Sequence, residues 1–424
     1  MFLYIIKTMD LSSGAIKEYL LDTNLFSQKR CEFKLPSGVD ALTNMKLLNI
    51  GAVRGAGGTD SPYNRGAGVM GLINRIALMN GADVLSECRD LNKQLAFRNL
   101  NTSNNNNNSY KTPVSLGSSN YQYGTLVGSA AANRFKQYAG VGYNEAKMTD
   151  SEASTSKGML ILSDVLPLLK NIEMLDTKVF RNGLRVVIEW ETDIYKIATD
   201  KTNTFTVLEP VLSMYEVVDE SLKNEMSIKD GVVSWYEREV DNRTYSAVAG
   251  AVSQKYNGFN NKRVRAFLVQ KEFNNVDNYV SGDNILGLGK CGSVALLDES
   301  FNMIVGGRQV FPTSISGADI ARQLCNAFGT VVGFLGFNKM DSASTANQFP
   351  LFQSLHRSNS VRTGDVGFYG VQMNNELVKT LELSISRSIT IAGKGSNDAI
   401  KVFIYADVAK VMSVSNGQYT ISYA

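Results

Sequence analysis

The sequence predicts an all-β protein built from two tandem β-sandwiches with short inserted helices. Three observations in this chain of 424 residues support the prediction. Most of the chain alternates apolar and polar side chains with the two-residue period of half-buried strands. Asn-Gly and Asp-Gly dipeptides, which suit tight hairpin turns, separate these segments. Segments with a helical period are few and short, which is typical of helices that cap the edges of sheets.

The strongest strand signal is the segment Leu381–Ile391, where apolar and polar residues alternate throughout. Leu184–Trp190 and Val264–Val269 are shorter segments of the same kind. Two hairpins are also predicted, one turning at Asn80-Gly81 and the other formed by Val411–Tyr423. Asn tolerates left-handed backbone angles and Gly adopts them freely, so both turns suit a direct connection between antiparallel strands.

Three short helices are predicted, over residues 88–100, 163–170 and 316–328. The second contains a proline near its start, where the missing N–H has no helical partner to lose. The third has Ile320 and Leu324 one turn apart, which gives it an apolar face. Helices this short fit a sheet-dominated fold.

A polar bridge over residues 199–204 separates two strand-rich halves of similar length. We therefore predict an N-terminal arm or accessory strand over residues 1–45, a first sandwich over 46–202 and a second over 203–424. The segment 101–123 is low in hydrophobic residues and is predicted to be an exposed, mobile loop, and the segment 342–360 is similar.

Composition excludes several classes of protein. Lys and Arg total 43 against 40 Asp and Glu, a net charge of +3, so no specific nucleic-acid site is predicted. The four cysteines form no CxxC pair, which excludes zinc ribbons and disulfide scaffolds and suits a reducing compartment. No window approaches 18 uncharged apolar residues, and the first residues do not resemble a secretory signal. We therefore predict no transmembrane segment.

Motifs that could carry chemistry are interpreted as structural. GxGxxG occurs at Gly66–Gly71 and Gly287–Gly292, but neither match lies between a buried strand and a long helix, as a dinucleotide site requires. His356, the single histidine, lies in a polar segment, where a surface or interface role is favoured over a general base. We predict no catalytic, cofactor-binding or metal-binding residues, and no enzymatic activity.

Several stretches of the sequence resemble those of a known protein family in the spacing and polarity of their residues. They are Gly71–Leu85, Leu160–Leu169 with Asn182–Trp190, Phe205–Tyr215, and Val402–Tyr405 continuing to Tyr423. Together they resemble the double jelly-roll major capsid proteins of tailless double-stranded DNA viruses, and most of all those of polinton-like viruses and virophages. The chain is short for this group, so the loops above each jelly roll are expected to be small.

The resemblance implies two tandem eight-stranded jelly rolls and a homotrimeric, pseudo-hexameric capsomer that tiles an icosahedral virus shell. It also implies penton and minor capsid proteins as partners, a place in the virion capsid, and assembly inside the host cell. Near-neutral charge agrees, since identical neighbours must not repel one another. The apolar residues within Phe349–Leu355 are our candidates for part of a trimer contact.

Two other functions stay open from the sequence. The first is a two-domain β-sandwich that binds a receptor or carbohydrate as a spike or fibre. Such a protein needs exposed aromatic side chains, for which Trp235 and Tyr236 are the candidates, because Trp190 lies inside an apolar strand pattern. The second is a nicotinamide or flavin enzyme using Gly66–Gly71, which would require long helices that the sequence does not predict.

Overall fold

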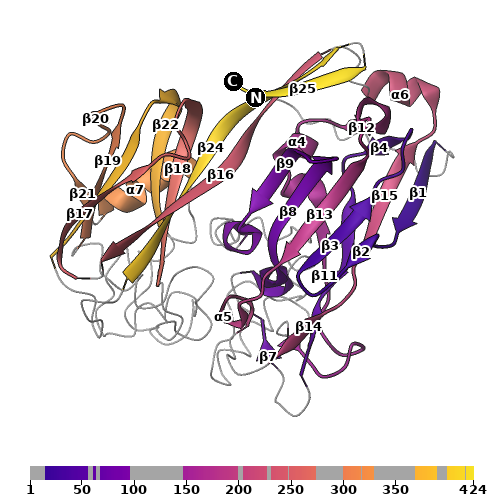
Figure 1. Cartoon of the computed structure of the whole chain (residues 1–424), viewed down its shortest axis with the longest axis horizontal. Helices are drawn as coiled ribbons and strands as arrows, with labels where there is room; N and C mark the ends of the chain where they lie inside the picture. Colours follow the sequence, from indigo (N-terminus) through magenta and orange to yellow (C-terminus); the bar gives the residue numbers. More distant parts are fainter. Residues whose placement is uncertain are drawn as a thin grey trace, which may run out of the picture.

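The computed structural model describes residues 15–55, 61–63, 67–95, 147–198, 204–226, 231–246, 248–273, 299–316, 318–328, 368–388, 399–415 and 417–424. The described strands form two lobes (Figure 1). Two long strands, β16 and β24, run from the second lobe toward the first, with β25 beside their far end. The predicted class, two tandem β-sandwiches with short inserted helices, is confirmed.

The first lobe contains two main antiparallel sheets. One holds six strands, in which β15 pairs with β1, β4 and β5: β1 (Ile16–Leu21), β4 (Asp40–Leu42), β5 (Lys46–Ile50), β11 (Gly158–Ile161), β12 (Met174–Asp176) and β15 (Val211–Val217). The other has the order β2 (Leu25–Phe26), β3 (Arg30–Lys34), β13 (Leu184–Trp190), β8 (Ile73–Asn80) and β9 (Asp83–Arg89). Two small sheets pair β6 (Ala52–Arg54) with β14 (Phe205–Val207) and β7 (Ser61–Pro62) with β10 (Lys147–Met148).

The second lobe also contains two main antiparallel sheets. The first has the order β16 (Gly231–Ser246), β24 (Ala399–Ser415), β18 (Lys262–Phe273) and β22 (Phe368–Val378), while β25 (Gln418–Tyr423) pairs with the far end of β24. The second has the order β17 (Gly250–Tyr256), β23 (Leu381–Arg387), β19 (Glu299–Val305) and β20 (Arg308–Gln309), with β21 (Ile315–Ser316) also on β19.

The helices lie at the edges and ends of these sheets. They are α4 (Pro167–Lys170), α5 (Ile194–Ile197), α6 (Glu220–Met226), α7 (Ala318–Phe328), a helical segment over residues 91–95, and the 3₁₀ turns η2 (Gly68–Leu72), η5 (Leu162–Asp164) and η6 (Thr177–Val179). Gly370 of β22 lies under α7, where a Cβ would come within 2.6 Å of the Leu324 Cα. The close approach of α7 to its sheet therefore requires glycine at this position.

Several predicted elements are confirmed. β13 coincides with Leu184–Trp190, and β23 confirms the alternating segment as far as Arg387. Both hairpins form, as β8 with β9 and as β24 with β25. Gly81 has φ +61° at the first turn position of the β8–β9 hairpin, a conformation that glycine adopts without strain.

The observed helices differ more from the predicted ones than the strands do. The start of the helix predicted over 88–100 is wrong: β9 continues to Arg89, with Cys88 buried and paired with Ile76, and only 91–95 are helical in the described part. The segment 163–170 divides into η5 and α4, whose first residue is Pro167, and α7 confirms the helix predicted over 316–328. The loops 101–123 and 342–360 lie outside the described residues.

Strand pairing bears on the division of the chain. The strands β1–β15 pair with one another, and β16–β25 pair with one another. The strands β1–β4, which precede residue 45, thus join the first lobe, as do β14 and β15, which follow residue 203. The boundaries near residues 45 and 202 stay predictions about folding units; we propose that the junction lies between β15 and β16.

Each lobe has its own apolar interior. The first core, which includes Phe33, Ile76, Val186 and Trp190, fills the space between the two main sheets of the first lobe. The second core includes Phe267, Phe301, Leu383 and Ile404. The first core also contains side chains from β16, β24 and β25, so the two lobes share packed surface.

Candidate functional site

The candidate site is the contact between the two lobes, where polar side chains of both gather beside the first core. On the first lobe it involves β9 and residues 91–95. On the second it involves a three-stranded surface, called the ribbon here: residues 231–237 of β16, residues 408–415 of β24, and β25. Opposite residues of the ribbon, such as Val233, Met412 and Ile421, point to one face and pack against the first core.

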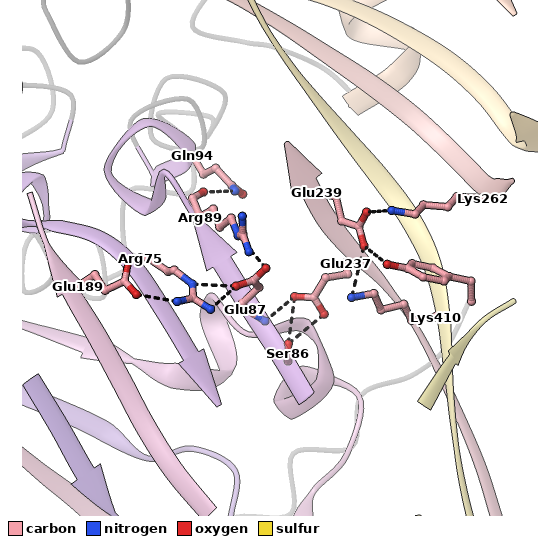
Figure 2. A network of polar contacts seen from close by, with 11 residues as sticks. Arg75, Ser86, Glu87, Arg89, Gln94, Glu189, Glu237, Glu239, Lys262 and Lys410 are labelled. Carbon is pink, nitrogen blue, oxygen red and sulfur yellow. Dashed lines mark hydrogen bonds and ion pairs between the residues drawn. The ribbon is translucent and has the colours of Figure 1, made fainter. Parts of the chain in front are cut away.

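Glu237 is the most enclosed charge of this contact, with no exposed surface. Its carboxylate accepts hydrogen bonds from the Glu87 backbone N–H at 2.8 Å and the Ser86 hydroxyl at 3.1 Å (Figure 2). It also accepts one from the Trp235 Nε1–H at 2.7 Å. Burial raises the pKa of Glu237, although Lys410 and these donors act in the opposite direction. Glu237 therefore caps the edge of β9 with an acceptor that comes from the other lobe.

Ion pairs lie on both sides of Glu237. On the first lobe, Glu87 accepts from Arg75 Nε at 2.7 Å, and Arg75 Nη1 reaches Glu189 at 2.6 Å, so charges alternate across β9, β8 and β13. On the second lobe, Glu239 binds Lys262 Nζ at 2.6 Å, and Figure 2 shows Lys410 beside the same carboxylate. This network joins strands within each lobe, and Glu237 joins the lobes.

Asp407 forms a second buried centre, only 3% exposed. It accepts hydrogen bonds from Arg238 Nε and Arg265 Nη2, both at 2.7 Å. Burial acts to raise the pKa of Asp407, but the two guanidinium groups outweigh it and hold the pKa below its usual value. These three side chains line an open cavity of about 750 Å³ between the lobes, together with Trp235 and Lys170.

A third link lies at the other end of β9. The buried Lys93 Nζ lies 2.9 Å from Glu272 Oε2 and 3.6 Å from the centre of the Phe403 ring. The Tyr405 hydroxyl donates to Asp90 at 3.1 Å. Ion pair, cation–π contact and hydrogen bond all run from the first lobe to strands of the second, so they fix one lobe against the other.

Among the residues that the structure describes, no group of three or more His, Cys, Asp or Glu is placed to hold a metal ion. No helix within the described ranges is long and apolar enough to cross a membrane. Gly68 and Gly71 lie in η2, which leads into the strand β8 and not into the helix that a dinucleotide site requires.

The structure corrects one candidate directly. Trp235, the proposed exposed aromatic platform, is 3% exposed and packs in the first core, because β16 turns that face toward the first lobe. Trp190 is buried as predicted. His356 and Phe349–Leu355 lie outside the described residues, as does Gly287–Gly292.

Sequence reasoning missed the contact between the lobes. Val233 and Trp235 lie on the inward face of β16, and Glu237 and Glu239 follow on the same face. Charged residues at such core-facing positions are the sequence signal that could have indicated this contact. Asp407 interrupts an apolar run between Val402 and Ala409 in the same way. A buried charge inside a strand pattern indicates a partner, but it does not name that partner.

Comparison with known proteins gives the class of fold. No family model and no curated protein matches the chain. The structure of the Sputnik virophage matches with a TM-score of 0.56 and 10% identity, over 96% of this chain and 88% of that one. The mavirus major capsid protein matches with a TM-score of 0.54 and 8% identity, over 97% and 90% of the two chains.

A third neighbour is the PBCV-1 protein VP54, as fitted into a reconstruction of Sputnik. Its TM-score is 0.51 at 10% identity, over 96% of this chain and 97% of that one. These neighbours are double jelly-roll major capsid proteins. The two lobes of this chain are therefore two jelly rolls in tandem, and the resemblance inferred from the sequence is confirmed at the level of the fold.

Proposed function

We propose that this chain is the major capsid protein of a double-stranded DNA virus, with no enzymatic role. Three copies form a pseudo-hexameric capsomer, and capsomers tile an icosahedral shell. Penton and minor capsid proteins are its further partners, and it resides in the capsid of the virion after assembly inside the host cell.

The observation that carries the proposal is the extent of the structural likeness. It includes both jelly rolls and spans 96–97% of this chain and 88–97% of three neighbours. A subunit with two similar lobes suits the proposal physically, because three copies around a threefold axis present six similar lobes to their neighbours. The ion pairs and shared core that fix one lobe against the other favour a rigid tile.

The test is the solution mass and the outline of the purified full-length chain. We expect particles of three times the 46.4 kDa chain mass, with a hexagonal outline in negative-stain images. A chain that stays monomeric at every concentration up to that of a capsid preparation would overturn the proposal. Binding to a glycan array without self-association would favour the spike or fibre function, which the burial of Trp235 already disfavours.

A variant tests the predicted trimer contact. Replacing Phe349, Leu351 and Phe352 together by Ser is expected to convert trimers to monomers, since obligate interfaces depend on apolar contact area. Unchanged tryptophan fluorescence would show that the variant is folded. Trimers that survive the triple substitution would exclude this segment as the contact.

A further inference from the structure

The first core is not built from the first lobe alone. Trp235, Met412 and Val414 are at most 6% exposed and belong to it, although they lie on β16 and β24. Val233, Tyr419 and Ile421 are half-buried against the same core. By contrast, the buried members of the second core in the described part of the chain lie between residues 245 and 408, in the strands of the second lobe and the turns between them.

The ribbon also closes the open edge of the first lobe. Among the strands that the structure describes, β9 pairs only with β8, so its other side needs acceptors and donors from elsewhere. Glu237 supplies an acceptor to the Glu87 N–H. At the end of β8, Asn80 Nδ2 donates to the Tyr419 hydroxyl at 2.7 Å, and the Tyr419 ring lies 4.8 Å from that of Phe180.

The ribbon thus adds an apolar wall to the first jelly roll along its β9 edge. Its inward face carries apolar side chains in register across three strands: Val233 opposite Met412, and Met412 opposite Ile421. Its outward face does not pack against the first core; Val232 on that face is 70% exposed. A removed ribbon would uncover buried parts of the first core and leave polar groups of β8 and β9 without their partners.

We propose that the ribbon completes the first jelly roll, so that the first lobe reaches its native packing only when β24 and β25 have docked on it. The stability of the first lobe then depends on residues of the second half of the chain. Among the described residues the second core contains side chains of the second lobe alone, so we do not expect its packing to depend on the first lobe in this way. The inference concerns the single subunit and is independent of its assembly.

The experiment compares core-facing and outward-facing changes in the full-length chain. Met412→Ala is expected to speed amide hydrogen exchange in β8 and β13 at least about tenfold, because a large buried side chain is lost from the shared core. Both tryptophans of the chain, Trp190 and Trp235, lie in that core, so intrinsic fluorescence follows its unfolding by denaturant. The fluorescence midpoint should fall in the same variant.

A matched pair of neighbours gives the control and keeps the test valid if Met412→Ala does not fold. Val233→Ala shortens an inward-facing side chain, and Val232→Ala shortens its exposed neighbour on the same strand. We expect faster amide hydrogen exchange in β8 and β13 for Val233→Ala. For Val232→Ala we expect the exchange rates of these strands to equal those of the parent. Exchange that rises in β16, β24 and β25 alone, with β8 and β13 unchanged, would show that the ribbon is a peripheral flap and would overturn the proposal.

Discussion

The two cores of this protein are closed in different ways. In the described part of the chain, the second core consists of side chains of its own lobe, whereas the first takes Trp235 and Met412 from strands that pair with the other lobe. The difference follows from strand length: β16 and β24 are 16 and 17 residues long, and one end of each extends beyond the second lobe. A tandem fold can therefore contain one self-sufficient sandwich and one that is completed from outside.

The largest expected effect comes from Trp235→Ala. Losing a buried indole and its hydrogen bond to Glu237 should lower the free energy of unfolding by about 3–5 kcal/mol. Hydrogen exchange should rise in β9 and β13, although Trp235 lies on a strand of the second lobe. Phe267→Ala, from the second core, is the comparison and should act first on β18, β19 and β23. Identical exchange patterns in the two variants would contradict the distinction between the cores.

Asp407→Asn should have the next largest effect. It leaves Arg238 and Arg265 facing a neutral amide in a buried site, and breaking a buried ion pair costs about 3 kcal/mol or more. Chemical denaturation measures the loss. Asp83→Asn, on the exposed start of β9, is the control and should stay within about 0.5 kcal/mol of the parent. Equal effects at both positions would show that the Asp407 pairing does not stabilise the contact.

Glu237→Gln tests the pH dependence of the contact. The pKa of Glu237 is raised in the folded state, so the folded protein holds its proton more tightly than the unfolded chain does. This group therefore favours folding at low pH, and its contribution is lost as pH rises through the folded pKa. The Gln variant lacks that contribution, so its stability relative to the parent should fall as the pH is lowered from 7 to 5.

Asp407 acts in the opposite direction, because its lowered pKa gives stability that is lost as the pH falls through that value. The parent and the Glu237→Gln variant share this effect, so it cancels when their unfolding curves are compared. A stability difference that stays constant between pH 7 and 5 would mean that Glu237 does not titrate differently in the two states.

The smallest expected effect is that of Tyr423→Phe. Its hydroxyl donates to Glu239 at 3.0 Å, but the side chain is 49% exposed, so removing this hydrogen bond should cost about 0.5 kcal/mol. The ring and its contact with Lys262 are kept. Thermal unfolding is the measurement, and a loss as large as that of Asp407→Asn would show that the end of β25 is as important as the buried contact.

Much of the fold could be predicted because local pattern decides it. β13 is an apolar segment with polar residues only at Arg185 and Glu189, it lies between β3 and β8, and its predicted and observed bounds agree. β24 was underestimated: Val402–Tyr405 is part of a strand that runs over Ala399–Ser415, because residues buried on both faces show no alternation. The helix predicted from Cys88 failed at its start because pairing with β8 outweighed local periodicity.

The contact between the lobes could not be predicted from pattern. Alternation shows that Trp235 and Glu237 share a face of β16, but it does not show which core that face contacts. The contacted core is set by residues far apart in sequence, such as Glu237 and Glu87, which are 150 residues apart. Glu237 could have been suspected as an anomaly, because a charge at an inward position must find partners. Its partners, Ser86 and the Glu87 N–H, become visible only in three dimensions.

The order in which the ribbon is made has a consequence during translation. The ribbon strands begin at residue 231 and β25 ends at residue 423, so a ribosome adding about 5–20 residues per second needs roughly 10 to 40 s to deliver them after β15 has emerged. Throughout that interval the nascent first sandwich lacks the ribbon, and its β9 edge is open to strands of other chains. Chaperone binding to the nascent chain should therefore persist until β25 has left the ribosome.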